Sequence, residues 1–170
     1  AVCRKYRITT ARDNPNVLVF PFYDENNIMQ FVKYRKTNFD KAKDKNKEWS
    51  ETGAKPILFG MRQCEDRETL VITEGQIDSL SLAEAGIKNA VSVPTGARGF
   101  TWYQHCADWI DGFREIIVFG DNENGQITLV NELQARVKQK LRVVRVKDYL
   151  GEKDANDILR RYGKNAIVQA

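Results

Sequence analysis

The sequence predicts an α/β domain with a Rossmann-like, mainly parallel sheet and flanking helices, preceded by a small β-rich N-terminal subdomain. From residue 56 onward, short apolar runs alternate with helical stretches, which is the order typical of a parallel sheet. Before residue 56, two β-rich runs flank a turn, as in a hairpin. The chain has 170 residues, 42% of them hydrophobic, so it is long enough to bury a substantial core. We expect the N-terminal subdomain to span residues 1–65 and the α/β domain to span residues 66–170.

The N-terminal hairpin is predicted from residues 17–23 and 28–35, which are rich in β-branched and aromatic side chains. Between them lies the sequence DENN, whose residues favour turns. The basic excess of the chain, whose net charge is +4, lies entirely in this N-terminal part. We therefore expect a small, positively charged antiparallel unit ahead of the parallel sheet.

A basic and aromatic segment overlaps the second strand of this hairpin and continues beyond it. Basic side chains neutralise phosphates and aromatic faces stack on bases, so the mixture favours a nucleic acid strand or a nucleoside triphosphate as ligand. A solvated loop is the alternative, because Asp40, Asp44 and Glu48 dilute the charge. The basic residues are Lys33, Arg35, Lys36, Lys41, Lys43, Lys45 and Lys47, and the aromatic ones are Phe31, Tyr34, Phe39 and Trp49.

The parallel sheet is predicted from four short apolar runs of the kind expected for strands that are covered on both faces. Helical stretches follow each of these runs, so each pair of strands is joined by a helix. The strands are expected at residues 69–73, 90–93, 115–119 and 141–146, and the helices at residues 77–85, 101–109, 127–140 and 155–162.

Acidic residues follow three of these strands. Glu74 ends the first, Asp121 and Glu123 follow the third, and Asp154 follows the fourth. The carboxyl ends of parallel strands meet at one edge of a sheet, where ligands bind. Clustered carboxylates repel one another unless a cation compensates, and an oxygen-only set selects Mg²⁺ or Mn²⁺. The pattern predicts a divalent metal site, and Gly75 lets the backbone and a ligand approach closely beside it.

Helix capping is the alternative explanation for some of these acids. Asp and Glu are common at the N-termini of helices, where they interact with free amide groups and the helix dipole. This explanation alone could account for Asp78 in the first turn of its helix, and it applies to Asp154 and Asp157 as well. The coincidence of three strand ends favours a metal site for Glu74 with Asp121 and Glu123.

The loop after the second parallel strand has the sequence VPTGARG. Thr95, Gly96 and Arg98 there offer backbone amides and a cation that could bind a phosphate. A plain turn remains the alternative, because proline and glycine are common turn residues.

Several kinds of site are excluded by composition. Three scattered cysteines and one histidine can form neither a disulfide framework nor a zinc module within this chain. No run approaches the roughly 18 apolar residues of a membrane helix, and no signal peptide pattern begins the chain. We expect a cytoplasmic protein with no membrane partner.

These motifs resemble the TOPRIM domain of topoisomerases, primases and some nucleases, in which Glu-Gly follows the first strand and DxD follows the third. TEGQIDSLSLAEAG and VFGDNENG occupy those places. With VSVPTGARG and KDANDIL in the same order, the chain looks more narrowly like the catalytic part of phage-type primases and primase-helicases. The basic hairpin is similar to the N-terminal subdomain of their RNA polymerase domain. Glu123 departs from the family pattern, which has aspartate there.

The resemblance implies DNA-templated synthesis of short RNA primers by metal-dependent nucleotidyl transfer. Glu74, Asp121 and Glu123 would be the catalytic, metal-holding acids, with Asp154 nearby. The implied partners are a single-stranded DNA template, ribonucleoside triphosphates and a replicative helicase in cis or in trans. A non-catalytic nucleic-acid-binding TOPRIM module and a TOPRIM nuclease stay open as alternatives. The residues expected to contact nucleotide or template are Lys33, Arg35, Lys36, Thr95, Gly96 and Arg98.

Overall fold

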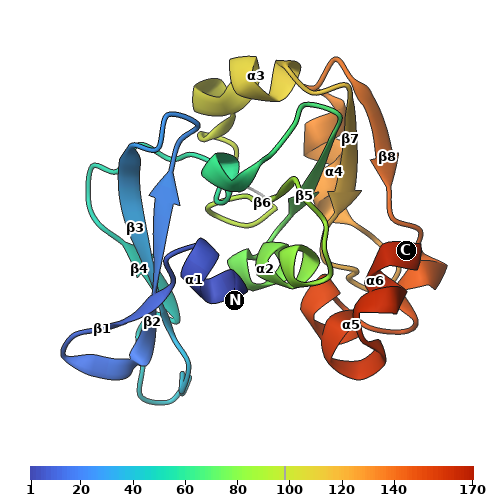
Figure 1. Cartoon of the computed structure of the whole chain (residues 1–170). Coiled ribbons are helices and arrows are strands. Elements are labelled where there is room, and N and C mark those ends of the chain that lie inside the picture. Colours follow the sequence, from blue (N-terminus) through green and yellow to red (C-terminus); the bar gives the residue numbers. More distant parts are fainter. Residues whose placement is uncertain (98) are drawn as a thin grey trace.

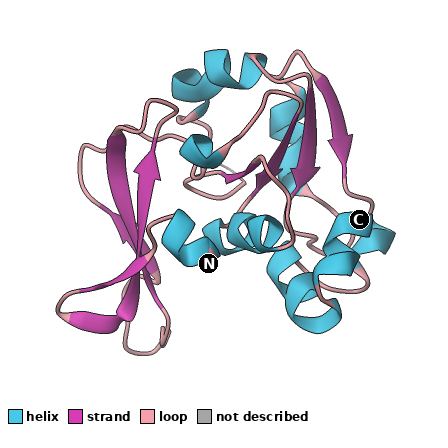
Figure 2. Cartoon of the chain, viewed as in Figure 1, coloured by secondary structure: helices cyan, strands magenta, loops and turns pink. Residues whose placement is uncertain are grey.

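The computed structural model describes residues 1–97 and 99–170 and contains two four-stranded sheets, which stand side by side (Figures 1 and 2). The N-terminal sheet is antiparallel, in the order β1-β2-β3-β4. The second sheet is parallel, in the order β6-β5-β7-β8, with flanking helices. The predicted fold class is therefore confirmed, whereas the predicted boundary at residue 65 stays a prediction.

The N-terminal sheet contains the expected hairpin and two further strands. Its elements are the short helix α1 (Val2–Lys5), β1 (Thr9–Ala11), β2 (Asn14–Tyr23), β3 (Met29–Lys36) and β4 (Glu48–Ser50). In the register of β2 and β3, Phe20 lies opposite Lys33 and Leu18 opposite Arg35. Because side chains alternate along a strand, Lys33 and Arg35 share one face of β3, and Tyr34 and Lys36 share the other.

The parallel sheet places the predicted strand ends at one edge. Thr73, the last residue of β5, pairs with Phe119, the last residue of β7, so Glu74 and Gly120 leave the sheet side by side. The strands are β5 (Thr69–Thr73), β6 (Ala90–Ser92), β7 (Glu115–Phe119) and β8 (Lys140–Val143), and the helices are α2 (Gln76–Glu84), α3 (Tyr103–Asp111), α4 (Thr128–Gln134), α5 (Ala155–Tyr162) and α6 (Lys164–Gln169). None of the helices in the described residues is long and apolar enough to cross a membrane.

Two expected elements of the parallel unit end well before their predicted limits. The helix predicted over 127–140 ends at Gln134, because the turn that follows is held from outside: Tyr103 Oη donates to the Arg136 carbonyl at 3.0 Å, and Gln139 Nε2 donates to the Ile110 carbonyl at 3.0 Å. The strand predicted over 141–146 ends at Val143, and a 3₁₀ turn follows at Val146–Tyr149.

Phe59 joins the two sheets into one hydrophobic core. Its backbone forms an antiparallel bridge with Ser92 at the outer edge of β6. Its ring is 1% exposed and contacts Phe22 and Phe20 of β2 edge-on, with ring centroids 5.2 and 6.0 Å apart, and Tyr6 at 5.5 Å. The apolar contacts are therefore continuous from the N-terminal sheet to the parallel sheet.

Candidate active site

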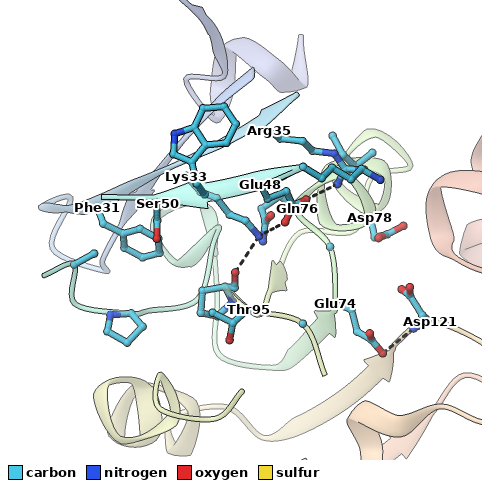
Figure 3. Close-up of a pocket in the computed structure, with 18 of the residues that line it drawn as sticks. Phe31, Lys33, Arg35, Glu48, Ser50, Glu74, Gln76, Asp78, Thr95 and Asp121 are labelled. Carbon is cyan, nitrogen blue, oxygen red and sulfur yellow. Dashed lines mark hydrogen bonds and ion pairs between the residues drawn. The ribbon is translucent and has the colours of Figure 1, made fainter. Parts of the chain in front are cut away.

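A cleft of about 730 Å³ lies between the N-terminal sheet and the carboxyl edge of the parallel sheet (Figure 3). Strands β3 and β4 supply one wall. The start of α2, the loop after β6 and the residues after β7 and before α5 supply the rest. The lining residues with charged side chains are Lys33, Arg35, Lys47, Glu48, Glu51, Glu74, Asp78, Asp121, Lys153 and Asp154.

Glu74 is fixed at the floor of this cleft by the end of β5. Its Oε1 accepts a hydrogen bond of 3.1 Å from the backbone amide of Asp121, which ties the first and third strand ends together. Burial, and next the charge of Asp121, raise the pKa of Glu74 to about 7. Gly120 makes room for this arrangement, because a Cβ there would lie 3.1 Å from Glu74 Oε1 and 2.8 Å from Ile127 Cγ2.

Lys153 neutralises part of the acidic edge. Its Nζ lies 3.0 Å from Asp121 Oδ2 and 3.9 Å from Glu123 Oε1, and the hydrogen bond to Asp121 raises the pKa of the lysine. Its carbonyl accepts from the Asn122 amide at 2.7 Å, so the segment before α5 is pinned to the turn after β7. The Glu123 side chain is 63% exposed and does not line the cleft, so this acid lies at the rim of the edge.

Asp78 is a functional candidate that sequence reasoning did not select. It is 8% exposed, and its Oδ1 accepts a 3.0 Å hydrogen bond from the Asn156 amide, so it caps α5 and not its own helix α2. Asp154 Oδ1 in turn accepts from the Asp157 amide at 2.8 Å, as the N-cap of α5. Burial, and next the charge of Asp154, raise the pKa of Asp78. Burial also raises the pKa of Asp154, with smaller contributions from the charges of Asp157 and Asp121. A usable signal in the sequence was the run of polar residues in α2, which lies between two apolar strands.

Gly75 gives Asp78 the space for this contact. Its φ of −106° suits any residue, but a Cβ would lie 2.6 Å from Asp78 Oδ2. We expect Gly75→Ala to displace the Asp78 carboxyl from the Asn156 amide and to lower the free energy of unfolding by about 1–3 kcal/mol, measured by urea denaturation. In an Asp78→Ala background the same change should cost nothing further, and an equal loss in both backgrounds would contradict this explanation.

Lys33 and Arg35 form the basic wall of the cleft. Lys33 Nζ contacts Glu48 Oε2 at 2.7 Å and donates to the Pro94 carbonyl at 3.0 Å, so it connects β3 with the loop after β6. Arg35 Nη1 contacts Glu48 Oε1 at 2.9 Å. Lys33 extends into the cleft from the wall opposite the Glu74 and Asp121 carboxyls (Figure 3).

Not all of the other residues predicted to contact nucleotide or template lie at the cleft. Thr95 and Gly96 line the cleft, and Thr95 Oγ1 donates to the Gly99 carbonyl at 3.3 Å. Lys36, on the opposite face of β3, pairs with Asp44 and does not line the cleft. Arg98 lies outside the residues that the structure describes.

The acidic edge fits a divalent cation by its chemistry. It offers carboxylate oxygens only. Burial, and next the charge of Asp121, raise the pKa of Glu74, so its charged form is disfavoured unless a cation binds there. Across residues 1–97 and 99–170, no three His, Cys, Asp or Glu side chains converge as a closed ligand set. An open set suits Mg²⁺, which is usually held by one or two carboxylates together with water and substrate phosphates. Glu74 and Asp121 are the residues that would hold it.

Removing Lys153 tests whether its ammonium group competes with such an ion. In Lys153→Met, Asp121 loses its partner, so we expect a lower melting temperature without metal and a larger gain on adding Mn²⁺ than in the wild type. Thermal melts over a MnCl₂ titration measure both effects. Lys164→Met, which removes an exposed lysine paired with Glu84, is the control. An unchanged response to Mn²⁺ in Lys153→Met would show that the lysine and the ion do not share a site.

Residues 71–159 match the family model described as Toprim-like. Two curated relatives come from Arabidopsis thaliana. A "primase homolog protein" is 25% identical over 93% of this chain and 50% of its own length. A chloroplastic and mitochondrial "Twinkle homolog protein" is 28% identical over 72% of this chain and 20% of its own length. The chain thus spans half, or less, of these relatives.

Solved structures give a similar result. The primase fragment of the bacteriophage T7 primase-helicase has a TM-score of 0.78 and 25% identity, with 99% of this chain and 67% of that chain covered. The T7 primase domain in a complex with DNA polymerase and an RNA/DNA hybrid has a TM-score of 0.80 at 25% identity, over 99% of this chain and 83% of that one. The Aquifex aeolicus primase shares the fold, with a TM-score of 0.72 at 16% identity over 91% of this chain and 39% of that chain.

Proposed function

The chain belongs to the Toprim-like family and has a primase-type fold, and from this premise we propose that it synthesises short RNA primers on a DNA template. The observation that carries the proposal is the cleft, in which the acids after β5 and β7 face the basic side of β3. A phosphoryl-transfer site needs both features, because a triphosphate must be positioned and the charge of its reacting phosphate compensated.

In the proposed reaction, the 3′-hydroxyl oxygen of one ribonucleotide forms a bond with the α-phosphorus of the next. The bond from that phosphorus to the β-phosphate bridging oxygen breaks, and pyrophosphate leaves. In this proposal Lys33 and Arg35, which line the cleft, position the triphosphate, and Glu74, which also lines it, accepts the hydroxyl proton. A divalent ion at Glu74 and Asp121 would supply charge neutralisation for the attacking and leaving oxygens.

The same chemistry on an existing phosphodiester would make the chain a nuclease, and binding without chemistry would make it a recognition module. Primer synthesis is favoured because the basic wall faces the acids across a cleft large enough for a nucleotide. We propose a single-stranded DNA template, ribonucleoside triphosphates and a replicative helicase as partners. The predicted cytoplasmic location stays a prediction.

Incubation with single-stranded DNA, an annealed RNA primer, labelled ribonucleotides and Mn²⁺ separates these functions in one assay. We expect lengthened RNA products whose added residues are complementary to the template. Shortened DNA without RNA extension would identify a nuclease. Binding of the hybrid with no change in either strand would identify a recognition module. Either outcome would overturn the proposed activity.

A further inference from the structure

A buried tyrosine joins the turn after β8 to the turn after β7. Tyr149, the last residue of the 3₁₀ turn, is 0% exposed and does not line the cleft. Its hydroxyl donates a hydrogen bond of 2.6 Å to the carbonyl of Gly120. Its ring packs edge-on against Phe119, with ring centroids 5.2 Å apart. No step of the proposed reaction uses this hydroxyl group.

The hydroxyl lies one peptide group away from Glu74. The carbonyl of Gly120 and the amide of Asp121 belong to the same planar peptide unit. That amide donates to Glu74 Oε1 at 3.1 Å, as the dashed line in Figure 3 shows. The hydrogen bonds therefore form a chain from the tyrosine hydroxyl through the peptide to the carboxylate. In such a chain each hydrogen bond polarises the next, so a donor to the carbonyl strengthens the amide as a donor.

The turn that follows Tyr149 keeps the tyrosine in this position. Leu150 and Gly151 have positive φ angles of 55° and 86°, and the Tyr149 carbonyl accepts from the amide three residues further on at 2.9 Å, which closes the turn. This reversal places Lys153 where its carbonyl accepts from the Asn122 amide at 2.7 Å. The turn after β7 is thus held at two points, by the tyrosine hydroxyl on one side of Asp121 and by Lys153 on the other.

We propose that Tyr149 is a positioning residue for Glu74. By holding the Gly120 carbonyl, its hydroxyl fixes the direction of the Asp121 amide and thereby the position of the Glu74 carboxylate at the cleft. The proposal rests on the proposed function in one respect, that Glu74 takes part in the reaction. The competing explanation is that the hydroxyl only satisfies a buried carbonyl and so stabilises the fold.

Hydrogen exchange of the Asp121 amide, followed by NMR, tests this chain of hydrogen bonds without metal or substrate. In Tyr149→Phe, which keeps the ring against Phe119 and removes the hydroxyl, we expect this amide to exchange about tenfold faster than in the wild type. The Asn122 amide, which donates to Lys153, should exchange less than about threefold faster. Equal acceleration of both amides would overturn the proposal, because a general loss of stability speeds both alike. A wild-type Asp121 amide without protection would also overturn it.

Tyr103→Phe is the matched control. The Tyr103 hydroxyl also donates to a backbone carbonyl, that of Arg136 at 3.0 Å, and neither residue lines the cleft. This variant should leave exchange of the Asp121 amide unchanged. Replacement of Tyr149 by 4-aminophenylalanine restores a donor at the same position and should return that exchange to within about threefold of the wild-type rate. Exchange as fast as in Tyr149→Phe would show that the hydrogen bond is not the cause.

Calorimetric titration with MnCl₂ gives a second measurement. Groups that hydrogen-bond to metal-holding residues support metal affinity, and here one peptide group stands between, so we expect the Kd in Tyr149→Phe to rise by about threefold to tenfold. Tyr103→Phe should bind like the wild type. A Kd in Tyr149→Phe equal to that of the wild type would reduce the hydroxyl to a structural contact.

The two proposals fail in different ways. Faster exchange of the Asp121 amide in Tyr149→Phe, without any RNA extension by the wild type, would overturn the proposed primer synthesis and leave the positioning of Glu74 intact. RNA extension by the wild type, with equal exchange in the wild type and Tyr149→Phe, would overturn the positioning role and leave primer synthesis intact.

Discussion

Glu74→Gln is expected to lower the rate of templated ribonucleotide addition by at least about a hundredfold. The substitution keeps the shape of the side chain and removes the charge that would hold a cation and accept the hydroxyl proton. Single-turnover extension of an RNA primer on a DNA template, with Mn²⁺ present, measures this rate. The melting temperature without metal should not fall, because the buried charge beside Asp121 is removed.

The control for this prediction is Glu65→Gln. Glu65 is half exposed, pairs with Lys5 and lies outside the cleft, so its extension rate should equal that of the wild type. Extension by Glu74→Gln within a few fold of the wild-type rate would remove Glu74 from the chemistry.

Phe59→Ala is expected to lower the free energy of unfolding by about 3–5 kcal/mol, or roughly 6–20 °C in melting temperature. The ring fills the space between Phe20, Phe22 and Tyr6, and the backbone bridge to Ser92 keeps the surrounding atoms from closing the cavity. Because this core is continuous between the two sheets, we expect one cooperative transition, followed by circular dichroism and tryptophan fluorescence.

Ile28→Ala is the matched control, since Ile28 is 58% exposed at the hairpin turn and its loss should change stability by less than about 0.5 kcal/mol. Two separate transitions in the wild type, one for each sheet, would contradict the shared core. A loss below about 1 kcal/mol in Phe59→Ala would show that Phe59 does not join the sheets.

The fold could be predicted because its signals are local. The runs at β5 and β7 are apolar, short and bounded by turn residues, and both strands have the predicted limits. The sequence of β4 gave no such signal. It has only three residues, two of which are a glutamate and a serine, and it forms a strand because it pairs with β3. The end of α4 was missed because side-chain contacts from Tyr103 and Gln139 determine it.

The positions of Glu74 and Asp121 could be predicted, because each residue follows the end of a predicted strand. The candidate site was not predictable where two distant segments meet. Asp78 caps a helix 78 residues further along the chain, and Lys33 donates to the carbonyl of Pro94 across the cleft. Alternation along β3 explains why Lys33 and Arg35 reach the cleft and Lys36 does not, but the sequence does not say which face meets the parallel sheet.

The proposed chemistry requires a divalent ion at Glu74 and Asp121, and calorimetric titration of the chain with MnCl₂ measures that binding directly. We predict saturable binding to the wild type, tighter binding to Lys153→Met, and weakening by at least about tenfold in Asp121→Asn, which loses a ligand charge. No binding to the wild type, or equal affinity in Asp121→Asn, would contradict the proposed metal site.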